Sequence, residues 1–372
     1  GSDNNESDTL DRIRKLGIPV TMGQRAENIK GAEMIVYTAA LLKDNPELVA
    51  AKASGIPTFE RSKLFGAISR MYKNCIGICG THGKTTTTSM TTQIMITAKL
   101  DPSAVKLPMM GSSGRVGKSE NFVCEACEFV DTFLDLSPDV AVILNIDEDH
   151  LDYFKTLDNL IKSFHKFASM ATKAVIYNGD DANTLKAMEG ISGKDLITFG
   201  MAEENDYYPE NIAPVHGAYY EFDAMHKGEF LCHIKLRVPG LHNVLNALAA
   251  LAASMYSGAD AESCRGGLDA FSGAHRRFEL LGKYKGVTFV DDYAHHPTEI
   301  KVTLEGVRQK YPDRKIVVVF KPNTYSRTKD FTEEFASALS IADKVFLTEI
   351  DCNREKQEDY PGVSSSLITE KI

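Results

Sequence analysis

The chain alternates short apolar runs with longer segments in which apolar and polar positions mix. Short apolar runs bounded by turn residues predict buried strands, and the mixed segments predict helices. The predicted strands span residues 33–38, 74–79, 121–124, 140–145, 173–177, 287–291, 315–320 and 344–347. The predicted helices span residues 45–51, 64–72, 89–95 and 242–255, with two more from 297 and from 329. Strands that alternate with helices predict an α/β fold built on parallel sheets.

The same pattern divides the chain into three expected domains, which suits a length of 372 residues. We place the boundaries at 1–73, 74–273 and 274–372. The strand and helix pattern restarts at each boundary, and no repeat or low-complexity segment interrupts it.

Composition and charge narrow the class of protein. A net charge of −9 argues against nucleic acid as a partner, because a phosphate backbone attracts a basic surface. No apolar run approaches the length of a membrane span, and the first residues lack a secretory signal pattern. We therefore expect a cytoplasmic protein, whose oligomeric state, monomer or dimer, the sequence leaves open.

The chain has seven cysteines, too few and too scattered for a disulfide framework. They are Cys75, Cys79, Cys124, Cys127, Cys232, Cys264 and Cys352. The Cys124-x-x-Cys127 spacing leaves a redox or zinc role open, but no second pair or matching histidine accompanies it. We expect both to be buried small apolar residues and the thiols to be reduced.

A glycine-rich loop with a Lys-Thr pair lies between the strand at 74–79 and the helix at 89–95. Such a loop binds phosphate through backbone N–H groups and the helix dipole, while the lysine reaches the terminal phosphates. Its spacing is unusual, because Ile78 stands where a nucleotide loop normally has its first glycine. The alternative is a plain glycine turn with a chance lysine. The expected ATP-binding residues of this loop are Gly80, Thr81, His82, Gly83, Lys84, Thr85 and Thr86.

Acidic and histidine side chains follow the next two buried strands. Glu125 ends one strand, and residues 145–152, which include His150, follow the other. Ligands of doubly wound sheets bind at the carboxyl ends of the strands, so both should approach Thr85. A hydroxyl, a carboxylate and an imidazole could hold Mg²⁺ or Mn²⁺ there. The alternative is a solvated acidic turn.

Further polar residues lie on the long helix and at the start of the last domain. Asn243 and Asn246 share one helix face and could contact a nucleotide, although Asn243 could equally cap the helix. The guanidinium group of Arg277 could bind a phosphate group. The run at 291–299 contains two acids, a tyrosine and two histidines between a strand and a helix, which is typical of a functional site.

These blocks together resemble the Mur ligase family of ATP-dependent amide-forming enzymes, and the resemblance covers nearly the whole chain. The matching blocks lie at residues 1–3, 44–48, 80–85, 133–139, 145–150, 240–244, 276–278 and 291–300. The resemblance implies a Rossmann-like N-terminal domain for the UDP-sugar, a central ATP-binding domain and a Rossmann-like C-terminal domain for the amino acid.

The implied reaction joins L-alanine to the lactyl carboxylate of UDP-N-acetylmuramate through an acyl phosphate, in peptidoglycan synthesis. ATP and Mg²⁺ or Mn²⁺ are the implied cofactors. The implied catalytic residues are Lys84, His150, His295 and Arg327; the metal ligands are Thr85, Glu125 and His150. Asn243, Asn246, Arg277 and Asp292 are added to the ATP site, and Asp3, Thr38, Tyr293, His295 and Arg327 to the substrate site.

The sequence departs from the family pattern in several places. The family normally begins with a strand and a glycine-rich turn before Ser2-Asp3, and it runs further past Ile372, so we expect both end domains to be incomplete. Residues 101–115 are shorter than usual. Asn323-Thr324 replaces a His-Arg pair, which removes one cationic contact.

Three alternatives remain. One is the related ligase that attaches a recycled tripeptide to the same UDP-sugar. Another is a phosphate-loop kinase or nucleotide hydrolase, against which the Glu125/His150 pair and the third domain argue. The last is a catalytically silent ATP-binding regulator, which the intact Lys84 disfavours.

Overall fold

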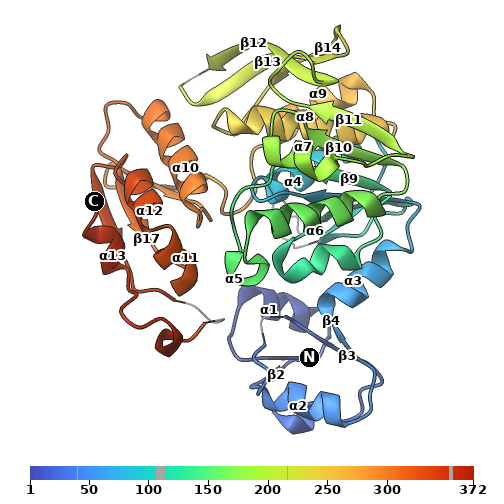
Figure 1. Ribbon diagram of the computed structural model, residues 1–372, viewed down its shortest axis with the longest axis vertical. Coiled ribbons are helices and arrows are strands. Elements are labelled where there is room, and N and C mark those ends of the chain that lie inside the picture. The colour runs from blue at the N-terminus through green and yellow to red at the C-terminus, as the bar shows by residue number, and fades with distance from the viewer. Residues whose placement is uncertain (40, 106–113, 216, 352–354) are drawn as a thin grey trace.

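The computed structural model describes residues 1–39, 41–105, 114–215, 217–351 and 355–372. Cys352 and most of the shortened 101–115 segment lie outside the described residues. Figure 1 shows a large central body, a small N-terminal lobe below it and a C-terminal lobe beside it. We call residues 274–372 the C-terminal lobe.

The N-terminal lobe contains two pairs of short parallel strands, β1 with β2 and β3 with β4. Its elements are β1 (Ser2–Asp3), α1 (Asp8–Lys15), β2 (Thr21–Met22), η1 (Ala26–Ile29), β3 (Ile35–Tyr37), α2 (Pro46–Ala53), β4 (Thr58–Glu60) and α3 (Arg61–Ser69). Asn45 caps α2, because its side chain accepts the backbone N–H groups of Glu47 and Leu48 at 3.1 Å each.

The central body is one sheet in the order β14-β13-β12-β11-β10-β9-β5-β8-β6-β7 within the described residues. In this order, every neighbouring pair from β12 to β6 is parallel, whereas the edge pair of β6 and β7 is antiparallel. The strands are β5 (Asn74–Cys79), β6 (Ser103–Val105), β7 (Gly114–Arg115), β8 (Asn121–Glu125), β9 (Val140–Ile143), β10 (Ala174–Asn178), β11 (Asp195–Phe199), β12 (Tyr207–Val215), β13 (Tyr219–His226) and β14 (Glu229–Lys235). The antiparallel hairpins β12–β14 were not predicted from the sequence.

Helices cover both faces of this sheet (Figure 1). They are α4 (Lys84–Thr97), η3 (Phe129–Asp135), α5 (Leu151–Phe154), α6 (Leu157–Met170), α7 (Ala182–Met188), α8 (His242–Tyr256) and α9 (Ala261–Ala270). Strand β9 illustrates the period of two: Val140 and Val142 join the core beneath α4 and α8, while Ala141 and Ile143 join the core beneath α6. The parallel α/β fold is thus confirmed.

The C-terminal lobe has an antiparallel pair, β15 with β16, and a parallel pair, β17 with β18. Its elements are β15 (Glu279–Tyr284), β16 (Val287–Asp291), α10 (Pro297–Lys310), β17 (Val317–Phe320), α11 (Tyr325–Asp330), α12 (Thr332–Leu339), β18 (Lys344–Leu347), η4 (Gln357–Asp359) and α13 (Ser366–Thr369). The helix expected from Lys329 is therefore two helices, because α11 begins at Tyr325 and α12 at Thr332. None of the described helices is long and apolar enough to cross a membrane.

Candidate functional site

The expected phosphate loop joins the end of β5 to the start of α4. Gly83 occupies the N-cap position with a φ of 86°, a left-handed conformation that glycine adopts readily. A Cβ at Gly83 would lie only 2.4 Å from the side-chain oxygen of Asn246. Asn145, which follows β9, holds the loop from the side: its Oδ1 accepts the His82 backbone N–H at 2.8 Å. The predicted order of strand, glycine loop and helix is confirmed, but the helix begins at Lys84 rather than at residue 89.

Lys84 is the first residue of α4, directly after this loop, and it faces a carboxylate that the sequence analysis missed. Its Nζ donates to the carbonyl oxygens of Gly80 and Thr81 and lies 3.0 Å from both oxygens of Glu128. Glu128 is only 2% exposed. Burial opposes the charge on Lys84, but the carboxylate of Glu128 outweighs it and raises the pKa of the lysine. Glu128 could have been found from its position three residues after Glu125.

The expected metal ligands lie around the start of α4. The Thr85 hydroxyl donates to Glu125 at 2.9 Å, so these two side chains meet as predicted. His150 Nε2 lies 4.0 Å from Glu128 Oε1 and 3.6 Å from Asp149 Oδ2. Burial lowers the pKa of His150 to about 4, which leaves the imidazole neutral at pH 7 and able to offer a lone pair.

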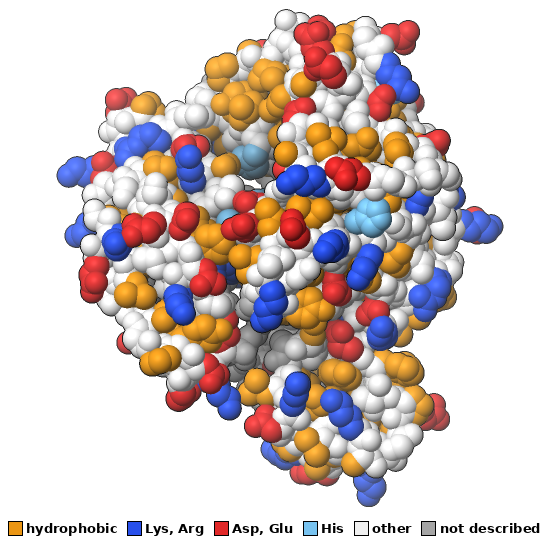
Figure 2. Space-filling view, in the orientation of Figure 1, with side chains coloured by type: hydrophobic (Ala, Val, Ile, Leu, Met, Phe, Trp, Pro, Cys, Tyr) orange, Lys and Arg blue, Asp and Glu red, His pale blue; other side chains and the backbone are white. Residues whose placement is uncertain are grey.

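A cavity of about 430 Å³ lies between the phosphate loop and the C-terminal lobe. Figure 2 shows a hollow along this junction. The expected ATP residues that line it are His82, Gly83, Thr85, Thr86, Asn243, Asn246, Arg277 and Asp292. Its apolar lining includes Phe271, Phe278 and Val302, which the sequence analysis did not single out. One wall thus comes from the central body and the other from the C-terminal lobe.

The two asparagines of α8 lie at the wall of this cavity, but Asn243 does not cap the helix. The N-cap position belongs to Leu241. Asn243 instead donates to the Pro239 carbonyl at 2.7 Å and accepts from Asn246 at 2.9 Å, while Asn246 Oδ1 accepts from Thr87 at 3.3 Å. The pair is thus held rigidly by a hydrogen-bonded chain.

The run at 291–299 forms the second wall and part of the neighbouring surface. Tyr293 lies against Arg276 and Arg277, whose guanidinium carbons are 4.6 Å and 5.6 Å from its ring centre. His295 Nδ1 lies 2.9 Å from the Tyr293 carbonyl oxygen, which can only accept, so Nδ1 holds the proton and Nε2 is the acceptor. Burial lowers the pKa of His295. Burial also raises the pKa of Asp292, whose oxygens accept backbone N–H groups.

Arg327, on α11, contacts the central body directly. Its Nε and Nη2 donate to Asp149 Oδ1 at 3.2 Å and 2.7 Å. Burial alone would raise the pKa of Asp149, but the charge of Arg327 outweighs it and holds that pKa well below its usual range. Thr324, at the position that departs from the family, caps α11 by accepting the Arg327 backbone N–H at 3.3 Å. The departure therefore helps to hold Arg327 in place.

Asp3 and Thr38 lie in the N-terminal lobe, outside the lining of the cavity. Asp3 ends β1 and accepts the Asn5 backbone N–H at 3.0 Å, and Thr38 follows the end of β3. Both sit at carboxyl ends of parallel strands, where ligands commonly bind. Their expected contact with a substrate stays a prediction.

The six described cysteines form no disulfide bonds with one another. Cys124 is buried in the core on β8, but Cys127 is only partly buried, so the expectation of a buried residue was wrong there. Cys127 lies two residues beyond the end of β8, directly before Glu128.

Comparison with known proteins identifies three family models along the chain. The Mur ligase family catalytic domain matches residues 1–73, the Mur ligase middle domain matches 78–254, and the Mur ligase glutamate ligase domain matches 276–372.

Curated relatives match over the whole chain. A UDP-N-acetylmuramate–L-alanine ligase of Agathobacter rectalis is 47% identical over 100% of this chain and 82% of its own length. The enzyme of the same name from Caldanaerobacter subterraneus is 44% identical over 100% of this chain and 81% of its own length. Among solved structures, the UDP-N-acetylmuramate-alanine ligase of Thermotoga maritima superposes with a TM-score of 0.81 at 30% identity, covering 94% of this chain and 79% of that one.

Proposed function

Because this chain belongs to the Mur ligase family, we propose that it joins L-alanine to the lactyl carboxylate of UDP-N-acetylmuramate, using ATP, in peptidoglycan synthesis. The observation on which this rests is the match of relatives with that printed activity over the entire chain. The two-walled cavity beside the phosphate loop supports it, because the proposed reaction needs ATP held next to a second substrate.

The proposed chemistry proceeds in two steps. The lactyl carboxylate attacks the γ-phosphate of ATP, the bond to the bridging oxygen breaks, and ADP leaves with that electron pair. The amine of alanine then attacks the acyl phosphate, and inorganic phosphate leaves. We assign Lys84 to the charge on the transferred phosphoryl group.

The second step requires a neutral amine and an acceptor for the proton that it loses. We assign His295 to this role, since its Nε2 holds a lone pair and burial lowers its pKa. Arg327 is assigned to the carboxylate of alanine through the guanidinium edge that does not face Asp149. Tyr293 is assigned to the substrate beside it, and Asp3 and Thr38 to the UDP-sugar.

A phosphate-release assay on the whole protein tests the proposal. It supplies UDP-N-acetylmuramate, ATP and Mg²⁺ with L-alanine, glycine, L-serine or the tripeptide, and identifies products by mass. L-alanine should be preferred, with glycine and L-serine as weaker substitutes, because an apolar pocket distinguishes one methylene by only about 1–3 kcal/mol. Preference for the tripeptide would assign the chain to the recycling ligase, and rapid release without any UDP-sugar would indicate a hydrolase.

We further propose that Mg²⁺ or Mn²⁺ is held by Thr85, Glu125 and His150. The donor types fit: the Thr85 hydroxyl and the Glu125 carboxylate meet at 2.9 Å, and the neutral imidazole of His150 lies 4.0 Å from Glu128, the partner of Lys84. When bound, the ion would neutralise charge on the phosphates.

Glu125→Ala tests this site. Changes outside the ligand shell already alter metal affinity by about 10–100-fold, so losing a charged ligand should raise the half-saturating Mg²⁺ concentration at least about tenfold. Direct Mn²⁺ binding, measured by electron paramagnetic resonance, should weaken in parallel. Glu120→Ala is the matched control, because Glu120 precedes the opposite end of β8 and pairs with Lys73 on the surface. Unchanged metal dependence in Glu125→Ala would place the ion elsewhere.

We also propose a cytoplasmic location, because ATP is abundant there and the described cysteines form no disulfide bonds, as in a reducing compartment. Cell fractionation tests it, and recovery with the exported proteins would contradict it.

A further inference from the structure

Three consecutive residues after β9 each contact the C-terminal lobe. Asp147 Oδ2 accepts the Thr298 hydroxyl at 3.1 Å, the Glu148 carbonyl lies 3.1 Å from His296 Nε2, and Asp149 pairs with Arg327 at 2.7 Å. These partners belong to the start of α10 and to α11. The turn that leads to His150 is therefore also the strip on which the C-terminal lobe rests.

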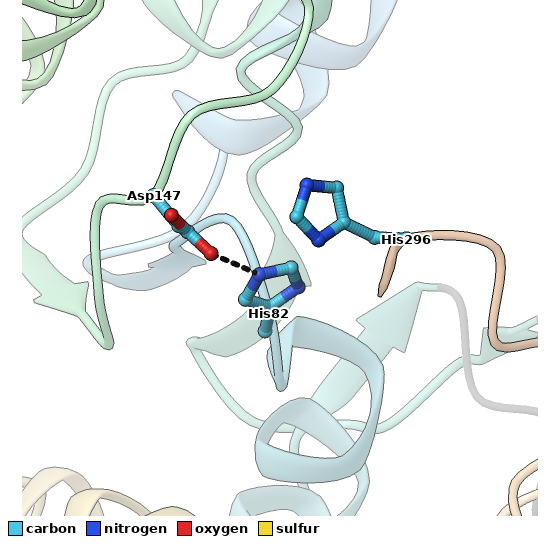
Figure 3. Close-up of side chains that lie close together, drawn as sticks. All are labelled: His82, Asp147 and His296. Atoms are coloured by element: carbon cyan, nitrogen blue, oxygen red, sulfur yellow. Dashed lines mark hydrogen bonds and ion pairs between the residues drawn. The ribbon is translucent and has the colours of Figure 1, made fainter. Parts of the chain in front are cut away.

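His82 connects this strip to the phosphate loop. Its ring lies with Nε2 3.1 Å from Asp147 Oδ2 and Nδ1 3.5 Å from Glu299 Oε1. Figure 3 shows the ring between Asp147 and His296, with the bond to Asp147 dashed. The side chain is 18% exposed. One side chain of the loop thus contacts both the strip and the first turn of α10.

We propose that His82 is a positioning residue, which ties the phosphate loop to Glu299 and so holds the two walls of the ATP cavity at their working separation. The proposal rests on the proposed function only in taking the cavity as the ATP site. The wall formed by Gly83, Thr86 and Asn246 belongs to the central body, whereas Arg277 and Val302 belong to the C-terminal lobe. The cavity keeps its shape only while these walls stay in register.

The charges around the ring suit a bridging cation. Asp147 and Glu299 face its two nitrogens, and the neighbouring positive or neutral groups are His296, His242 and Arg277. Burial opposes protonation, but the two carboxylate hydrogen bonds outweigh it and raise the pKa of His82 to about 9. At neutral pH both ring nitrogens are therefore N–H donors, one for each carboxylate.

A metal site is the competing interpretation, since one donor atom each of His82, Asp147 and His296 lie within 4.8 Å of one another. However, both nitrogens of His296 are already used. Nδ1 accepts the Thr298 backbone N–H at 3.3 Å as the cap of α10, which makes Nε2 the N–H that donates to the Glu148 carbonyl. No lone pair of that ring is left for an ion, so the geometry favours the ionic bridge.

The test measures the binding of a nonhydrolysable ATP analogue with Mg²⁺ by calorimetry, a readout that does not depend on which amino acid is ligated. His82→Gln and Glu299→Gln should each weaken binding about tenfold, because either change separates the walls. The double variant should bind the analogue no more weakly than the weaker-binding single variant, since both changes remove the same bridge. Thr298→Val, which removes the next contact on the strip, provides a second probe if His82→Gln folds poorly.

His233→Gln is the matched control. His233 pairs with Asp223 at 2.7 Å in the β13–β14 hairpin, away from the cavity lining, and its loss should leave analogue binding unchanged. Additive effects of His82→Gln and Glu299→Gln would overturn the bridge. Stoichiometric Zn²⁺ binding by the wild type that is lost in His82→Gln would also overturn it, in favour of the metal site. If the ligation assay fails, the test for additive effects and the Zn²⁺ measurement can still be interpreted, because neither depends on ligation.

Discussion

At the scale of single residues, the pair of Lys84 and Glu128 shows how the charge that we propose for the phosphoryl group is kept inside the protein. The ammonium lies 3.0 Å from both carboxylate oxygens, and Glu128 is 2% exposed. Two buried opposite charges compensate each other, whereas either one alone would face a large desolvation penalty. The lysine therefore needs its partner to stay charged before the phosphates arrive.

Lys84→Met should consequently be both inactive and unstable. Removing one member of a buried pair typically costs about 3–5 kcal/mol, because the remaining charge is left without compensation. Adding Glu128→Gln should restore most of the free energy of unfolding, measured by urea denaturation, without restoring ligation.

Glu128→Gln alone separates the effect of the pair on stability from the effect of the lysine on ligation, since it keeps the lysine while removing the buried carboxylate. A Lys84→Met protein as stable as the wild type would contradict the pairing. Turnover in the double variant would show that the cation at this position is dispensable.

At the scale of elements, the sequence predicted most of what local pattern controls. The bounds of β5 and β18 match the prediction, and α8 and α10 begin at the predicted residues, whereas α4 begins at Lys84, before the predicted helix at 89–95. The hairpins β12–β14 were missed because the prediction relied on apolar runs separated by helices. Antiparallel strands at an exposed edge instead alternate polar and apolar residues, and no helix lies between them. Helix boundaries near Lys329 were also wrong, because Thr324 starts α11 by capping, a signal that apolar spacing does not contain.

The packing of α9 against α4, the helix of the phosphate loop, depends on one glycine of an adjacent pair. A Cβ on Gly267 would lie 2.5 Å from the Ile94 Cα, whereas a Cβ on Gly266 would meet only the Thr97 methyl at 3.4 Å. Gly267→Ala should therefore destabilise the protein by about 1–3 kcal/mol, as overpacking does. Gly266→Ala should be neutral or stabilising by up to about 1 kcal/mol, because alanine favours helix.

Thermal unfolding of the two variants measures this difference, and each serves as the control for the other, because they change the same residue type in the same helix. Equal melting temperatures would mean that α4 and α9 adjust without strain. Displacement of α4 in Gly267→Ala should also weaken binding of the ATP analogue, since α4 begins at Lys84.

At the scale of the whole molecule, the site is assembled from residues that the sequence cannot relate to one another. Arg327 and Asp149 are 178 positions apart, and His82 and Glu299 are 217 apart. The periodicity of the sequence places each of these residues on its helix, strand or loop. The rule that ligands bind at the carboxyl ends of parallel strands correctly predicted that Thr85 and Glu125 lie close together. Contacts between lobes depend on how complete surfaces fit, so the roles of Asp147 and Asp149 appeared only in three dimensions.

The lobe contact should make the stability of the molecule depend on pH in the alkaline range. The pKa of His82 rises from an ordinary value of about 6.5 in the unfolded chain to about 9 in the folded protein. The folded state therefore holds its proton more tightly, so the contribution is complete below about pH 6.5 and declines as pH rises through 9. At 1.36 kcal/mol per pKa unit, it reaches about 3 kcal/mol at most.

The free energy of unfolding of wild type minus that of His82→Gln, followed from pH 6 to pH 10, isolates this term, because every other titrating group is common to both proteins. The difference should be largest near pH 6 and should level off above about pH 9. His233→Gln is the control for the substitution itself, because His233 pairs with Asp223 in the β13–β14 hairpin and not at the lobe contact. A difference that stays flat across the range would mean that His82 is neutral in the folded protein, and that Asp147 and Glu299 are held by other partners.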